Sequence, residues 1–150
     1  MRTGTILLVE DNRDDEELTK RAFKNGRIKN EIAVVRDGAE ALEYIFCNGK
    51  YSNRSIEDSP DVVLLDLNLP KVDGLEVLRR IRSDERTKYL PVIVLTSSRE
   101  DSDLLGGYEN GANSYIVKPV DSEQFEESIR QLGLYWLVLN ETAPSKSNPR

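Results

Sequence analysis

Five short apolar runs, each ending in polar residues and separated from the next by a longer, more polar stretch, constrain the fold of this chain most strongly. Because the runs are continuous rather than alternating, both of their faces should be buried, as in the strands of a parallel sheet. The alternation of such strands with helices predicts a three-layer α/β domain with right-handed crossovers. The expected strands are Ile6–Val9, Ile32–Val35, Val62–Leu65, Pro91–Leu95 and Tyr115–Val117.

The segments between these runs carry signals that are typical of helices. Apolar spacing predicts a helix over residues 13–25. Two Asp-Gly-x-Glu segments, at residues 37–40 and 73–76, are interpreted as capping boxes that open the next two helices. We expect the first of these helices to continue to Gly49, and the polar residues 50–60 to form a long surface loop.

Composition limits the classes of protein that fit. The chain has 150 residues, of which 38% are hydrophobic and 32% charged, which predicts one soluble domain with no membrane span. A net charge of -6 argues against nucleic acid as a partner. Cys47 is the single cysteine and no signal peptide is expected, which favours a cytoplasmic protein. The absence of histidine excludes a Ser-His triad and a histidine metal site.

Polar residues able to take part in phosphate or metal chemistry follow four of the five expected strands. They are Glu10-Asp11, Asp66, Thr96 and Lys118. Ligands of open α/β sheets bind beyond the carboxyl ends of the strands, so these residues are expected to converge. Each also has a simpler interpretation: Asp66 as a turn or capping residue, and Glu10-Asp11 as the cap of the following helix.

The charges at this edge favour one kind of chemistry. Carboxylates of Glu10, Asp11 and Asp66 would repel one another, and a hard divalent cation with oxygen ligands, such as magnesium, would relieve the repulsion. Lys118 would add a positive charge on the other side. A carboxylate flanked in this way is able to accept a phosphoryl group as a nucleophile, which predicts this role for Asp66.

The motifs taken together resemble the receiver domain of response regulators in two-component signalling. The resemblance extends from about Thr5 to Leu139 and implies a flavodoxin-like strand order 2-1-3-4-5 with helices on both faces of the sheet. It also implies a single receiver domain over residues 1–150 with a core at about 5–139, and the Pro-, Ser- and Asn-rich end of the chain predicts a disordered tail at 140–150. The motifs that carry it are Val9–Asn12, Leu65–Pro70, Asp73-Gly74, Thr96-Ser97 and Lys118-Pro119.

The resemblance also implies a role for each residue of the site. Asp66 would be the phosphoacceptor and a magnesium ligand. Asp11 would bind the metal directly, Asn68 through its backbone carbonyl and Glu10 through water. The residues that would bind the phosphoryl group and switch the surface are Thr96, Ser97, Lys118 and Tyr115. The protein would then be no classical enzyme, although it would take part in its own phosphorylation and slow dephosphorylation.

Further features narrow the kind of receiver. Few residues follow Leu139, so we expect a stand-alone regulator that signals by protein contacts. Gly49–Tyr51 and Tyr135-Trp136 resemble segments of regulators partnered with bacterial phytochromes, which implies a phytochrome-type sensor histidine kinase as the partner. The apolar end of the last helix predicts a homodimer or partner surface, formed by Leu134, Leu137 and Val138.

Two rival functions remain open from the sequence. A phosphatase of the haloacid-dehalogenase type also uses a strand-end aspartate, but it needs a second acid two residues later, where this chain has Asn68. An amide cannot serve as that general acid. The other rival is a receiver-like binding module that is never phosphorylated, and the complete set of Glu10, Asp11, Asp66, Thr96 and Lys118 argues against it.

Overall fold

The apolar runs form one five-stranded parallel sheet in the order β2-β1-β3-β4-β5. The computed structural model describes residues 4–26, 28–67, 69–96, 111–117 and 123–131. The predicted α/β class and the strand order 2-1-3-4-5 are thereby confirmed. The strands are β1 (Thr5–Val9), β2 (Glu31–Val35), β3 (Val62–Asp66), β4 (Val92–Thr96) and β5 (Ser114–Val117). The helices are α1 (Arg13–Asn25), α2 (Gly38–Phe46), α3 (Gly74–Ser83) and a helix at residues 123–131.

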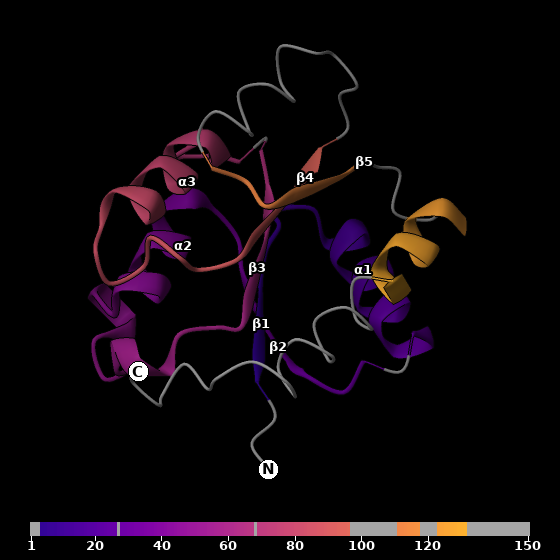
Figure 1. Cartoon of the computed structure of the whole chain (residues 1–150), viewed down its shortest axis with the longest axis horizontal. Coiled ribbons are helices and arrows are strands. Elements are labelled where there is room, and N and C mark those ends of the chain that lie inside the picture. The colour runs from indigo at the N-terminus through magenta and orange to yellow at the C-terminus, as the bar shows by residue number, and fades with distance from the viewer. Residues whose placement is uncertain (1–3, 27, 68, 97–110, 118–122, 132–150) are drawn as a thin grey trace.

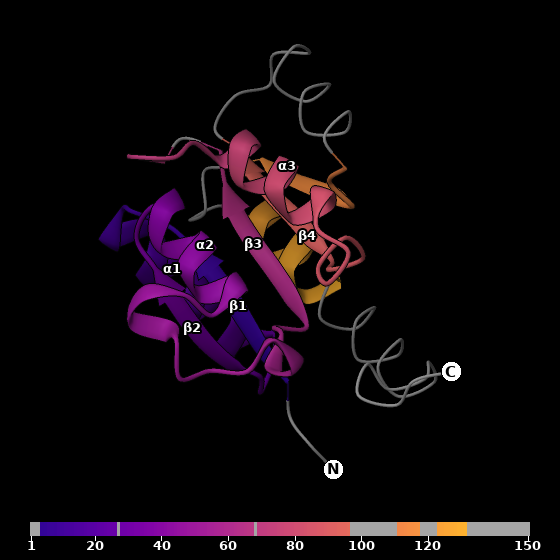
Figure 2. The same ribbon diagram turned by 90° about the vertical axis from the view of Figure 1, so that its left-hand side faces the viewer.

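Helices cover both faces of the sheet, which explains why the strands are apolar throughout. In β1, Leu7 and Val9 belong to the core beside α2 and α3, whereas Ile6 and Leu8 belong to the core beside α1 and the helix at residues 123–131. Figure 1 shows these two helical layers on either side of the sheet, and Figure 2 shows β3 running between β1 and β4.

The segment after α2 differs from the sequence prediction. The helix ends at Phe46 rather than continuing to Gly49, because Cys47 adopts a left-handed conformation with φ of 59°. The expected loop contains two short 3₁₀ helices, η1 (Gly49–Tyr51) and η2 (Ile56–Asp58). Within the described ranges, no helix is long and apolar enough to cross a membrane.

Glu40 ties this segment back to α2. Its carboxylate accepts hydrogen bonds from the Tyr51 hydroxyl at 2.7 Å and from the Arg36 backbone N–H at 2.9 Å, and it pairs with the Lys50 ammonium at 2.9 Å. Burial alone would raise the pKa of Glu40, but these partners lower it below its ordinary value. Burial and the bond to Glu40 together raise the pKa of Tyr51 to about 12. The Glu40 side chain therefore ties η1 and the residue after β2 to α2.

Candidate functional site

Glu10 and Asp66 occupy corresponding places on neighbouring strands. β1 and β3 run parallel with Val9 opposite Leu65, so the next residue of each strand lies at the same carboxyl edge of the sheet. Glu10 is 0% exposed and Asp66 is 4% exposed, whereas Asp11, the next residue after Glu10, is exposed. Strand register thus brings together two buried acids and one that faces solvent, as the sequence predicts.

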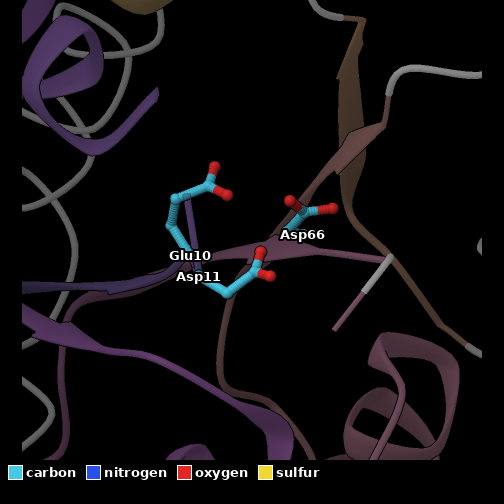
Figure 3. A group of neighbouring side chains, drawn as sticks. All are labelled: Glu10, Asp11 and Asp66. Atoms are coloured by element: carbon cyan, nitrogen blue, oxygen red, sulfur yellow. The ribbon is translucent and has the colours of Figure 1, made fainter. Parts of the chain in front are cut away.

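The three carboxylates form one compact cluster. An oxygen from each of Glu10, Asp11 and Asp66 lies within 4.8 Å of the others, and Figure 3 shows the three groups gathered beyond the strand ends. Two full charges at that separation, such as those of the buried Glu10 and Asp66, repel by about 3–4 kcal/mol at an effective dielectric near 20. A donor set made only of oxygens suits a hard divalent cation, which would offset this repulsion. The residues present therefore fit the predicted magnesium site.

The helix that follows the acid pair begins with a different capping residue. The side chain of Asn12 accepts a hydrogen bond from the backbone N–H of Asp15 at 2.9 Å, and Asn12 is the N-cap of α1. The backbone N–H of Asn12 in turn donates to the Glu10 carboxylate at 3.3 Å. The interpretation of Glu10-Asp11 as the cap itself is therefore wrong, because Asn12 fills that position and leaves the acids beside Asp66.

The start of α3 lies against the backbone that carries Asp66. The backbone N–H of Gly74 donates to the carbonyl of Leu67 at 3.1 Å. A Cβ atom at Gly74 would lie 2.5 Å from the Asp66 carbonyl oxygen and 2.6 Å from the Leu67 Cα, both of which are backbone atoms. The sequence predicts Gly74 as part of a capping box and of a family motif, and neither of these foresees the contact with the Asp66 backbone.

In each predicted capping box, only one of the two expected hydrogen bonds is formed. Asp73 accepts a hydrogen bond from the Glu76 backbone N–H at 3.0 Å, and Asp37 accepts one from the Glu40 backbone N–H at 2.7 Å. The glutamates, however, do not complete the reciprocal bond to the capping residue. Glu76 pairs instead with arginines of its own helix, and Glu40 binds the N–H one residue before the cap. The helix starts are nevertheless where the motifs predict them.

The other predicted site residues are described only in part. Thr96 ends β4, one residue beyond Leu95, whose partner in the sheet is Asp66, so its backbone reaches the same edge. Tyr115 lies in β5, half-buried against the core beside α2 and α3. The side chain of Thr96 is outside the described part of the chain. So are the residues Asn68, Ser97, Lys118, Leu134, Leu137 and Val138, whose predicted roles the structure does not test.

This geometry defines a parallel α/β domain with an acidic, cation-compatible cluster at the carboxyl edge of its sheet. The chain belongs to the response regulator receiver domain family, whose model matches residues 6–130. The resemblance inferred from the motifs is thereby confirmed. Membership places the chain among two-component signalling proteins rather than among classical enzymes.

Two curated relatives are similar over most of their length. The probable methanogenesis regulatory protein FilR2 of Methanothrix harundinacea is 44% identical over 135 residues, which cover 90% of this chain and 84% of that protein. The response regulator Rcp1 of Synechocystis sp. is 36% identical over 132 residues, which cover 88% of each chain.

Solved structures of response regulators, two of them from phytochrome systems, are similar in fold. The phosphorylated cyanobacterial phytochrome response regulator RcpA has a TM-score of 0.81 at 40% identity, covering 91% of this chain and 95% of that one. The bacteriophytochrome response regulator RtBRR has a TM-score of 0.79 at 50% identity, covering 95% and 86%. The manganese-bound form of Rcp1 has a TM-score of 0.80 at 35% identity, covering 98% and 99%.

Proposed function

We propose that this protein accepts a phosphoryl group on Asp66 from a sensor histidine kinase and signals through altered protein contacts. The observation that carries the proposal is the buried carboxylate of Asp66 at the end of the central strand, with oxygens of Glu10 and Asp11 within 4.8 Å. A buried acid beside two other acids is unfavourable unless the site uses the charge. The crystal structure of RcpA is of its phosphorylated form, which supports the same chemistry here.

The proposed reaction is a direct transfer between two side chains. An oxygen of the Asp66 carboxylate attacks the phosphorus of a phosphohistidine on the kinase. The P–N bond breaks, the imidazole nitrogen keeps the electron pair, and Asp66 becomes an acyl phosphate. Asp11, Asp66, the backbone carbonyl of Asn68 and, through water, Glu10 would hold magnesium. When bound, magnesium would neutralise charge on the transferring group. The manganese-bound structure of Rcp1 supports a divalent cation.

We assign the binding of the new phosphoryl group, and the change of surface that follows, to residues in and directly after β4 and β5. Thr96 and Lys118 would bind the new phosphoryl oxygens, Ser97 would leave room for them, and Tyr115 would follow Thr96 and change the surface. Phosphorylation stabilises the signalling conformation only by the difference in its interactions with the two states. The apolar residues Leu134, Leu137 and Val138 would form the dimer or partner surface. Hydrolysis of the acyl phosphate by the protein itself would be slow.

A phytochrome is the kinase that we propose. RcpA and RtBRR are regulators of phytochrome systems, and their identities of 40% and 50% to this chain support a related partner. The protein would then act in the cytoplasm, where such kinases present their phosphohistidine. FilR2, which is 44% identical, is described as a probable methanogenesis regulator, so the kinase has to be tested directly.

Phosphotransfer from a panel of autophosphorylated histidine kinases tests this proposal. With the phytochrome kinases of the panel we expect label to move from kinase to regulator faster than with kinases of other classes. The readout is the initial transfer rate for each kinase in the presence of magnesium. Transfer from none of the kinases would contradict the proposed function, whereas fastest transfer from another class of kinase would replace the phytochrome as partner.

A further inference from the structure

The turn between β2 and α2 (residues 36–37) and the first residue of α2, Gly38, contact the segments that follow both parts of the acidic cluster. β2 ends beside the acid pair, because the Glu10 backbone N–H donates to the Val35 carbonyl at 3.0 Å. Arg36 follows directly and is half-buried. From this turn, contacts run in two directions, one to the helix that follows Asp11 and one to the loop that follows Asp66.

The first contact joins Arg36 to α1. The Arg36 guanidinium donates a hydrogen bond to the carboxylate of Glu16, a residue of α1 that is only 4% exposed. The Lys20 ammonium lies 2.8 Å from the other carboxylate oxygen of Glu16. Burial would raise the pKa of Glu16, but the hydrogen bonds from Arg36 and Lys20 outweigh it and lower the pKa. Glu16 is therefore a charged, buried anchor near the start of α1.

The second contact joins the same turn to the loop after β3. The Gly38 backbone N–H donates to the Pro70 carbonyl at 3.4 Å, and the Lys71 ammonium lies 3.5 Å from the Asp37 carboxylate. A Cβ atom at Gly38 would lie 1.7 Å from the Val72 carbonyl oxygen, so the two backbones touch. The loop that leaves Asp66 is thus held against the start of α2.

We propose that Arg36 is a positioning residue for divalent cation binding, which sets the place of α1 and Asp11 relative to Asp66 through its bond to Glu16. Lys20 cannot do this, although it neutralises the same carboxylate, because it belongs to the same helix as Glu16. Arg36 reaches Glu16 from a different element, the end of β2. The inference rests on the proposed function in that it takes the acidic cluster to be a cation site.

Electrostatic repulsion and positioning predict opposite changes in cation affinity when the charge of Arg36 is removed. Removing a cation near three carboxylates should strengthen the binding of a divalent ion, because one repulsive charge is lost. Losing the bond that fixes α1 should weaken it, and loss of outer-shell support of a metal site costs about 10- to 100-fold in affinity. The sign of the change therefore separates the two effects.

The experiment measures the dissociation constant of Mn²⁺ by electron paramagnetic resonance of the free ion, on the full chain. We expect Arg36→Met to raise the constant about tenfold, and Lys20→Met, which removes the same charge from Glu16, to leave it unchanged or lower. Glu16→Met, which removes the acceptor of this bond, should match Arg36→Met, and the double variant should lose little more than either single one, because both remove the same bond. Arg36→Lys should restore most of the affinity.

The outcomes separate this inference from the proposed function. Equal constants for Arg36→Met and Lys20→Met, or tighter binding by Arg36→Met, would overturn the positioning role. If Arg36→Met fails to fold, Glu16→Met decides alone, and wild-type affinity in that variant overturns the inference. Failure of the wild-type chain itself to bind Mn²⁺ would count instead against the proposed cation site.

Discussion

Asp66→Asn is expected to reduce phosphorylation by acetyl phosphate to background, a loss of more than about 10³-fold in rate, by analogy with removal of other enzymatic nucleophiles. The amide lacks the negative charge of the carboxylate and cannot form the acyl phosphate. The measurement is the fraction of protein that gains a phosphoryl group, followed by intact-protein mass spectrometry with magnesium present.

Asp58→Asn is the matched control for this variant. Asp58 is exposed in η2 and precedes β3, so it lies toward the opposite edge of the sheet from Asp66. We expect this variant to be phosphorylated at the wild-type rate. Wild-type phosphorylation of Asp66→Asn would show that another residue is the phosphoacceptor.

Gly74→Ala is expected to have the second largest effect, on both stability and phosphorylation. The new methyl group would lie 2.5 Å from the Asp66 carbonyl oxygen and 2.6 Å from the Leu67 Cα, and neither backbone atom can turn away as a flexible side chain would. Overpacking of this kind costs about 1–3 kcal/mol. Urea unfolding should show that loss, and the phosphorylation rate should fall because the segment of Asp66 must shift.

Gly26→Ala provides the comparison for Gly74→Ala. Gly26 ends α1 with a φ of -82°, which alanine adopts readily, and the nearest atom to its new Cβ would be the Ala22 carbonyl oxygen at 3.3 Å. Its stability should stay within about 1 kcal/mol of wild type. Equal stability of the two alanine variants would contradict the close approach of α3 to the Asp66 backbone.

The sheet and the acidic cluster follow directly from local sequence patterns. Continuous apolar runs identify the strands, and a parallel register carries residues that end neighbouring runs to one edge, which is why Glu10 and Asp66 were predicted to meet. The resemblance supplied the strand order, which the apolar runs alone leave undetermined. The family match and the strand pairing confirm both.

These local patterns do not predict contacts between residues that are far apart in the sequence. The bond from Arg36 to Glu16 and the contact of Gly38 with Val72 depend on how α1, α2 and the loop after β3 pack, and no spacing in the sequence encodes that packing. The early end of α2 was also not predicted: Cys47 is left-handed and its backbone N–H donates to the Glu43 carbonyl, whereas the local pattern favoured a longer helix.

The most direct test of the central claim is to locate the phosphoryl group on the wild-type chain. The protein is incubated with acetyl phosphate, with and without magnesium, and the modified peptide is identified by tandem mass spectrometry. The account predicts one phosphoryl group, on Asp66, formed only with magnesium and removed by hydroxylamine as an acyl phosphate should be. A phosphoryl group on any other residue, or none at all with magnesium present, would contradict it.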